Sequence, residues 1–181
     1  MSLEGDEMNN ESRLGITGDS ASISFRSVAA GDEAFLLKVY ASARAQEMAL
    51  VPWTDEQKEA FLKMQLAAQL QHYQTYYPEA ENLLILLEGA PVGRLYVGRS
   101  SEAIRILDIA ILPEYRRRGI GTAIIKYLIR EAAQVNLPVW IHLEFNNQYF
   151  QLFERLGFVN TGGDGMYFKL EWRPGAIPES R

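Results

Sequence analysis

The sequence predicts one mixed α+β domain in which helices flank a mostly antiparallel sheet. Two observations support this fold class. The hydrophobic pattern switches between helical spacing and strand-like runs along the chain. Three consecutive apolar runs in the middle are joined by short links, which is typical of an antiparallel meander. The predicted element order is β-α-α-β-β-β-α-β-α-β-β, an α+β arrangement.

The first half of the chain is predicted to form one strand and two helices. Residues 22–26 alternate in polarity as a strand does. Asp32 stands at the N-cap position of a helix that runs to about Met48. Residues 54–57, Thr-Asp-Glu-Gln, form a capping-box pattern that opens a second helix, which ends near Tyr76. We expect these helices to form an antiparallel pair.

The second half begins with the meander and then alternates helices with strands. The meander strands are predicted over 83–87, 92–97 and 104–112. Pro113 ends the third strand, because proline cannot continue a ladder of hydrogen bonds. The remaining elements are a helix from Ile120 to about Ala132, a strand over 138–145, a helix over 149–156 and a closing strand over 166–172.

Composition excludes several classes of site. The chain has 181 residues, with 18 Lys and Arg against 23 Asp and Glu, a net charge of −5. It has no cysteine, which excludes disulfides, cysteine–zinc sites, iron–sulfur clusters and a thiol nucleophile. Its two histidines, His72 and His142, argue against a multi-histidine metal site. We expect no metal, and the acidic balance argues against nucleic acid as a partner.

The ends of the chain predict the domain boundaries. Residues 1–21 are polar and lack an apolar core, so we expect a disordered leader and no signal peptide. The predicted domain covers residues 22–173, and residues 174–181 form a tail that begins with Pro and Gly. No stretch approaches the roughly 20 apolar residues of a membrane-spanning helix. We therefore expect a cytoplasmic protein with no membrane partner.

The segment from Leu112 to Thr122 carries the strongest functional signal. An apolar strand leads into three arginines and two glycines, and an amphipathic helix follows. Helix N-termini expose unpaired N–H groups, and glycine lets the backbone approach a ligand, so the pattern favours an anion such as phosphate. A tight turn with solvated arginines is the structural alternative.

Two motifs resemble the GNAT N-acetyltransferase superfamily. Residues 116–121, Arg-Arg-Arg-Gly-Ile-Gly, are similar to its pyrophosphate-binding motif Gln/Arg-x-x-Gly-x-Gly/Ala. Residues 146–158 resemble a second block, in which an Asn precedes Leu-Tyr-Glu-Lys-Leu-Gly-Phe; here that ending reads Leu-Phe-Glu-Arg-Leu-Gly-Phe. The element order from about Ile23 to Trp172 is also similar, which implies the GNAT-like fold.

The resemblance implies acetyl-CoA as the co-substrate and a set of residues that bind it. The loop residues are Arg116, Arg117, Arg118, Gly119, Ile120, Gly121 and Thr122. The pantetheine arm would pair with the backbone of Ile109, Ile111 and Leu112, and the thioester end would be lined by Asn146, Asn147, Phe150 and Phe153. Alternatively, Asn146 caps the following helix, and the two phenylalanines pack in the core.

The candidate general acid and general base follow the family pattern less closely than the residues that bind acetyl-CoA. Members of the family usually place a Tyr general acid at the position of Phe153, which has no hydroxyl. Tyr149, one turn earlier, and Tyr115 are the substitutes we consider. Asp108 interrupts an apolar strand, where a carboxylate is costly unless it is used or paired. The family's diamine acetyltransferases resemble this segment in carrying an Asp there.

Each carboxylate also has an ordinary structural interpretation. Asp108 could be bonded to a loop or to the neighbourhood of Arg105. Glu144 is a second base candidate, with a surface ion pair as its alternative. Glu47 and Trp53 fall where the family builds its acceptor pocket, and a Trp beside an acidic residue suits a cationic amine. An ordinary core Trp is the alternative there.

The sequence thus predicts an N-acetyltransferase that moves an acetyl group directly from acetyl-CoA to a primary amine of a small molecule or peptide. The alternative is a catalytically weak GNAT-fold domain that binds acyl-CoA as a sensor or assembly module. The family often dimerises, so the resemblance allows a homodimer, which no segment of the sequence indicates by itself.

Overall fold

The computed structural model describes residues 16–18 and 21–175. The strands are β1 (Ile16–Gly18), β2 (Ala21–Ser27), β3 (Glu81–Leu87), β4 (Ala90–Arg99), β5 (Ile104–Ile111), β6 (Val139–Glu144), β7 (Val159–Gly163) and β8 (Tyr167–Trp172). The α-helices are α1 (Glu33–Ala43), α2 (Ala45–Ala49), α3 (Asp55–Tyr76), α4 (Ile120–Gln134) and α5 (Phe150–Arg155). Two short 3₁₀ helices are η1 (Ala30–Asp32) and η2 (Pro113–Tyr115).

The strands form one sheet in the order β1-β2-β3-β4-β5-β6-β8-β7. Every neighbouring pair is antiparallel except β5 and β6, which are parallel. The predicted α+β class and the β3-β4-β5 meander are therefore confirmed. β1 lies within the segment predicted as a leader, and residues 1–15, 19–20 and 176–181 lie outside the described residues.

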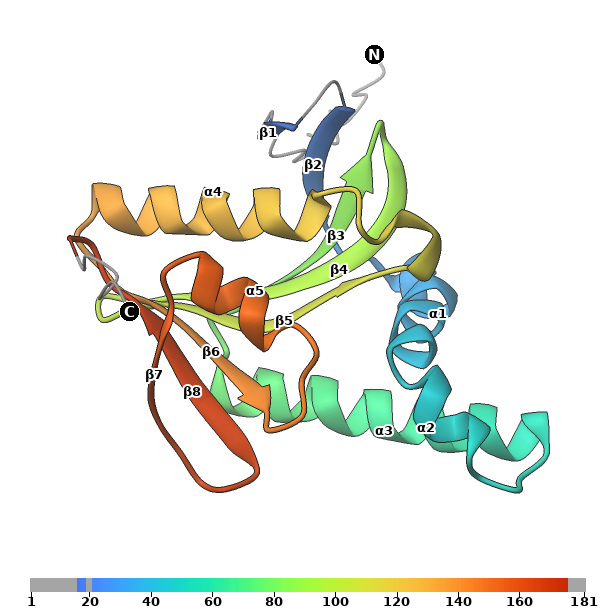
Figure 1. The fold of residues 1–181 in the computed structure, drawn as a ribbon. Coiled ribbons are helices and arrows are strands. Elements are labelled where there is room, and N and C mark those ends of the chain that lie inside the picture. Colours follow the sequence, from blue (N-terminus) through green and yellow to red (C-terminus); the bar gives the residue numbers. More distant parts are fainter. Residues whose placement is uncertain (1–15, 19–20, 176–181) are drawn as a thin grey trace, which may run out of the picture.

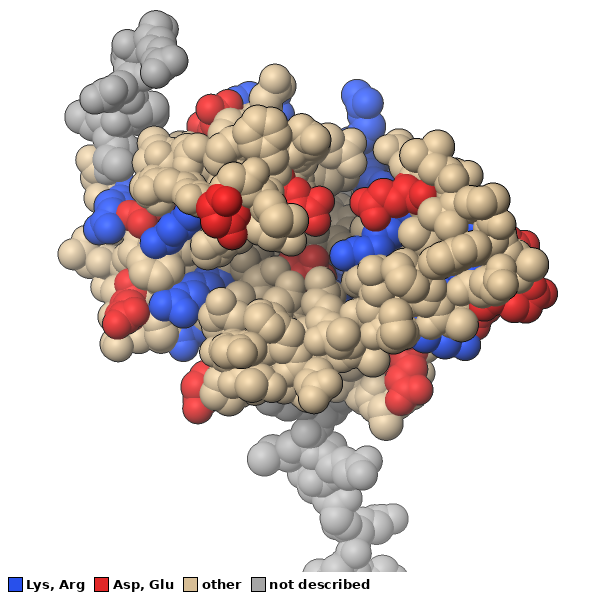
Figure 2. Space-filling view, turned by 90° about the horizontal axis from the view of Figure 1, so that it is seen from below, with Lys and Arg blue, Asp and Glu red and all other residues tan. Residues whose placement is uncertain are grey.

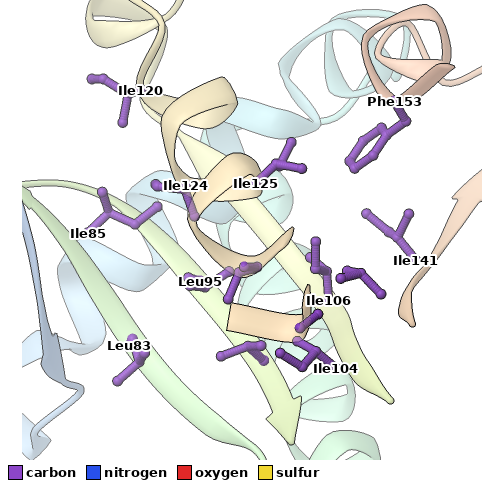
Figure 3. Close-up of a cluster of buried hydrophobic side chains, with 14 of the residues drawn as sticks. Leu83, Ile85, Leu95, Ile104, Ile106, Ile120, Ile124, Ile125, Ile141 and Phe153 are labelled. Carbon is purple, nitrogen blue, oxygen red and sulfur yellow. The ribbon is translucent and has the colours of Figure 1, made fainter. Parts of the chain in front are cut away.

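Helices cover both faces of the sheet (Figure 1). On one face, α4 and α5 enclose the main core, where Ile124, Ile125 and Phe153 meet isoleucines and leucines of β3 to β6 (Figure 3). On the other face, α1 and α3 pack over a second cluster that includes Leu84 and Leu86 of β3. Alternating side chains of β3 feed the two clusters, as the pleat of a strand requires.

The predicted helix starts differ in outcome. Thr54 Oγ1 accepts from the Gln57 amide at 3.3 Å and Gln57 Oε1 accepts from the Thr54 amide at 3.0 Å, so the capping box is confirmed. Asp32 makes no side-chain cap on α1; its carboxylate accepts from the Ala29 amide at 2.8 Å and pairs with Arg26. The helix predicted up to Met48 is broken at Arg44 into α1 and α2.

Among the described residues, no helix is long and apolar enough to cross a membrane.

Candidate active site

The loop between β5 and α4 presents a row of unpaired backbone N–H groups. Arg117 (φ 62°) and Gly119 (φ 77°) both adopt the left-handed conformation, which curls the chain before the helix begins. The Arg116 amide donates to Pro113 O at 3.2 Å and the Ala123 amide to Gly119 O at 2.9 Å. Within residues 21–175, the six amides between them have no hydrogen-bond acceptor. Such a concave set of donors at a helix N-terminus suits an anion.

The three arginines of this loop have different surroundings. Arg116 is turned toward the protein: its Nε donates to Ile111 O at 2.7 Å and its Nη2 to Ser42 Oγ at 3.4 Å. The Arg118 guanidinium lies 5.3 Å from the centre of the Tyr115 ring. Arg117 and Arg118 are both exposed. Arg116 thus ties the loop to the end of β5, while the other two leave their charges at the surface.

β5 and β6 part beside this loop. They pair over only three residues, from Ile104↔Val139 to Ile106↔Ile141, and then diverge (Figure 1). The Leu112 amide donates to Val92 O of β4 at 2.9 Å. Because ladder bonds alternate along an antiparallel pair, the backbone groups of Ile109 and Ile111 turn to the open side. Of the predicted pantetheine partners, Ile109 and Ile111 therefore have free edges, whereas the Leu112 N–H is already used.

A β-bulge at Leu107 sits at the point where the strands part. Tyr96 pairs with Asp108 and Val97 pairs with Ile106, so Leu107 is the extra residue. Its carbonyl accepts from the Tyr73 hydroxyl at 3.0 Å. Burial raises the pKa of Tyr73 well above its ordinary value, and the charge of Asp108 adds to this shift. Tyr73 therefore remains a neutral donor that holds the bulge.

The bulge brings Asp108 to the α3 face, where it meets a buried arginine. Arg94 is 2% exposed, and its Nε donates to Asp108 Oδ2 at 2.9 Å. Arg94 Nη2 donates to the same oxygen and to Gln69 Oε1, the latter at 2.7 Å. Arg94 Nη1 is buried and has no acceptor among the described residues. Asp108 is thus half of a buried ion pair with Arg94, not a partner of Arg105.

Comparison with known proteins places the chain. The family model described as Acetyltransferase (GNAT) family matches residues 39–158, about two thirds of the chain. This range covers the loop, the parting strands and α5. The chain belongs to the GNAT acetyltransferase family.

Solved structures of similar fold agree with this assignment. A PaiA N-acetyltransferase from Thermoplasma acidophilum in complex with coenzyme A has a TM-score of 0.58 at 20% identity, with 84% of this chain and 99% of that chain covered. A putative phosphinothricin N-acetyltransferase gives 0.59 at 18%, with 86% and 100% covered. An acetyltransferase from Thermus thermophilus gives 0.60 at 16%, with 83% and 96% covered. At these identities the likeness shows the fold alone. No curated protein matches the chain.

In this GNAT chain, the residues after β6 lie on the other side of the opening. Glu144, Asn146 and Tyr149 are exposed. Asn147 turns the chain into α5: its Oδ1 accepts from the Tyr149 amide at 2.9 Å and its carbonyl from the Phe150 amide at 3.1 Å. The side-chain hydrogen bond at the start of α5, which we considered for Asn146, is therefore made by Asn147.

The two phenylalanines of the second GNAT motif differ in burial. Phe153 is 1% exposed and packs edge-on against Phe158, with ring centres 5.2 Å apart. Phe150 is half-buried, and its ring centre lies 5.3 Å from that of Phe168. The core-packing interpretation therefore holds for Phe153.

The predicted acceptor residues lie on a separate segment, between α2 and α3. Glu47 is exposed on α2, and Trp53 is 42% exposed with its ring edge-on to Phe61 at 5.2 Å. Burial raises the pKa of Tyr40, and both Asp108 and Glu47 contribute to this rise. The charges of Glu47 and Asp108 therefore both influence the hydroxyl of Tyr40.

Sequence reasoning missed Arg94 and Tyr73. Arg94 is the one charge in the predicted strand 92–97, and Asp108 is a lone acid in the adjacent strand of the meander. Opposite lone charges on neighbouring strands were the available signal. Tyr73 carried no such signal, because its role depends on a bulge in a strand far along the chain.

Proposed function

We propose that this chain is an N-acetyltransferase that transfers an acetyl group from acetyl-CoA directly to a primary amine of a small molecule or peptide. The observation that carries the proposal is the set of six unpaired amides at residues 117–122, directly beside the free backbone edges of β5. The amides suit an anion, and the free edge of β5 suits an extended chain that carries amide groups. Coenzyme A has both partners, a pyrophosphate and an amide-containing arm. We expect such a protein to act in the cytoplasm.

The residues present fit that ligand. The amides of residues 117–122 would hold the pyrophosphate, and Arg117 and Arg118 would add charge-assisted donors. The edges of Ile109 and Ile111 would pair with the pantetheine amides. An N–H group of the same edge would polarise the thioester carbonyl without any titratable side chain. The thioester supplies the activated acetyl group.

Direct transfer requires the protein to position the amine, to remove one proton from it and to supply one proton to the departing thiolate. The chain has no cysteine, so no thiol is present to take up the acetyl group. The amine forms the new C–N bond while the C–S bond breaks, and holding both reactants together supplies much of the rate. Asp108 and Glu144 are the candidates to receive the proton of the amine. Tyr149 or water protonates the departing thiolate.

A second function stays open because of Phe153. The ring fills the core and offers no hydroxyl at the usual position of the acid. A catalytically weak domain that binds acyl-CoA as a sensor or assembly module would have the same CoA site without that acid. Tight CoA binding without thioester consumption across an amine panel would favour this alternative.

Two measurements test the proposal. Calorimetric titration with CoA should show binding, and the double change Arg117→Gln/Arg118→Gln should weaken it about tenfold, a loss of about 1.4 kcal/mol. Arg130→Gln, an exposed arginine further along α4, is the matched control and should bind CoA as the unaltered protein does. Thiol release from acetyl-CoA with an amine panel then tests transfer. Absence of CoA binding at high micromolar concentration would refute the proposal.

A further inference from the structure

A basic hollow lies on the α3 face of the sheet where β5 and β6 part. It is bordered by Leu107 of β5, by Trp140 and His142 of β6, by Lys169 of β8 and by Tyr77 after α3. The view from below shows this side of the molecule hollowed near its centre, with side chains of both charges around it (Figure 2). The hollow thus begins next to the bulge that positions Asp108.

Two cations share one indole ring in this hollow. The Lys169 Nζ lies 3.9 Å, and the Arg105 guanidinium carbon 4.9 Å, from the centre of the Trp140 ring. Glu102 is the acidic partner of Arg105, at 3.4 Å, but its side chain is 72% exposed, so solvent weakens the pair. Within the described part of the chain, Lys169 has no ion-pair partner. Glu171, two residues along β8, is engaged by Arg173.

Two residues that line the hollow, Arg105 and Trp140, each have a buried donor without an acceptor in the described part of the chain. Arg105 Nε and Trp140 Nε1 are two of the four buried side-chain polar atoms that have no partner within the described residues. Both are donors, and buried donors normally have an acceptor. Burial lowers the pKa of His142, as do the charges of Lys169 and Arg105, while Asp164 opposes them. The local charge is therefore positive in a chain whose net charge is −5.

We infer that this hollow binds an anionic oxygen group, a carboxylate or phosphate ester, on the acceptor, which is then an amine that also carries an acid. The inference rests on the proposed function. An oxyanion between Arg105 and Lys169 would compensate both charges and accept charge-assisted hydrogen bonds from them. The Tyr77 ring offers an apolar surface to a methylene chain between acid and amine.

The strand geometry sets the length of that chain. Ile106 borders the hollow, and Ile109 is the first of the two residues whose free edges would pair with the pantetheine arm. Three residues of strand span roughly 10 Å. The amine and the acid are therefore several bonds apart, as in a lysine side chain or a short peptide. An amine directly next to its carboxylate is too short.

Matched pairs of acceptors test the inference through thiol release. Lysine and cadaverine differ only in the carboxylate, and 5-aminopentyl phosphate and 5-aminopentanol differ only in the phosphate. We expect kcat/KM for one acid-bearing member to exceed that of its partner at least tenfold, and the favoured pair identifies the acid. Arg105→Gln and Lys169→Gln should each reduce this ratio about tenfold. Lys63→Gln, on the exposed side of α3, should leave the ratio unchanged.

A binding measurement keeps the inference independent of turnover. Glutarate and inorganic phosphate are titrated separately into the CoA-saturated protein. Binding of one of them that weakens at least fivefold in Arg105→Gln or Lys169→Gln supports the site, even if no amine is acetylated. Such a lack of acetylation would refute only the proposed function. Equal or better use of the acid-free amines, or acid binding that both variants retain, would overturn the inference.

Discussion

Two features lie close together where β5 and β6 diverge. One is the buried ion pair of Arg94 with Asp108, and the other is the unpaired backbone edge of β5. Arg94 is almost completely buried and depends on Asp108 and Gln69 for its hydrogen bonds. Asp108, in turn, keeps one side open, since its side chain is 25% exposed. Changes at Asp108 should therefore affect stability through the buried cation, and activity as well if it acts as the proposed base.

Asp108→Asn should destabilise the protein by about 3 kcal/mol, because removal of one partner leaves the Arg94 charge buried and uncompensated. Urea denaturation measures the loss in the free energy of unfolding. The double change Arg94→Met/Asp108→Leu is the control and should recover most of this stability, since neither charge remains. An Asp108→Asn protein as stable as the unaltered one would show that Arg94 does not depend on this carboxylate.

The two glycines of the loop should respond differently to alanine. Gly119 has φ 77°, so a Cβ there costs about 1–2 kcal/mol and disturbs the row of amides. At Gly121, an added Cβ would lie 3.5 Å from Ile111 Cδ1, an ordinary contact, and alanine favours the helix. We expect Gly119→Ala to weaken CoA binding several-fold and Gly121→Ala to leave it nearly unchanged, as measured by calorimetry. Equal losses would contradict this account of the loop.

At the scale of elements, local sequence determines where helices begin, while pairing across the sheet determines which face a side chain occupies. The capping box at residues 54–57 could be predicted because both hydrogen bonds are made within four residues. The side-chain cap expected from Asp32 is absent because Arg26, on β2, engages that carboxylate. The Arg44 break was also missed, since no proline or glycine marks it in the sequence.

Thr54→Ala should cost α3 about 1 kcal/mol, because the change leaves the Gln57 amide without its acceptor. In a protein of this size, that corresponds to a fall in Tm of roughly 2–4 °C. Thr75→Ala is the matched control: this exposed threonine on the same helix bonds only the Gln71 carbonyl behind it, at 2.8 Å. Its Tm should change by less than half as much, and an equal fall would argue against capping as the cause.

At the scale of the whole molecule, the sequence predicted which segments form the strands of the sheet better than it predicted the geometry of the site. Apolar runs and short links define β3, β4 and β5, because each feature is local. The parallel β5–β6 pair and its early end are not local, since they join residues 35 positions apart, such as Ile104 and Val139. The loop residues were identified from their motif, whereas Arg94, Tyr73 and the basic hollow emerged only when distant strands were aligned.

Stability should fall on mild acidification through His142. Burial, Lys169 and Arg105 lower the pKa of His142 below its ordinary value of 6.5. His142 is therefore protonated at a higher pH in the unfolded chain than in the folded protein. As pH falls from about 7 toward the folded-state pKa, the free energy of unfolding decreases. Because the ring is partly exposed, we expect a change in Tm of at most about 2 °C.

Thermal unfolding between about pH 5.5 and 7.5 measures this effect. His142→Gln should flatten the profile over this range and leave the steeper loss at lower pH. That loss includes Asp32, whose carboxyl pKa is lowered chiefly by the hydrogen bond from Arg26, so its contribution disappears in acid. An unchanged slope in His142→Gln would show that another group titrates.

The extra residue at Leu107 makes β5 sensitive to changes of chain length. Ile104 and Ile106 face the α4 core, and without the bulge strict alternation would point Asp108 into that core as well. Straightening the strand with Leu107 in place would thus turn the C-terminal half of β5 inside out, with Asp108 among isoleucines and Ile109 against Arg94. Deleting Leu107 would instead leave Ile106, Asp108 and Ile109 in simple alternation on their present faces, and would remove only the bulge and the carbonyl that the Tyr73 hydroxyl contacts. A one-residue insertion further along β5 would exchange the two faces unless a second bulge absorbed it.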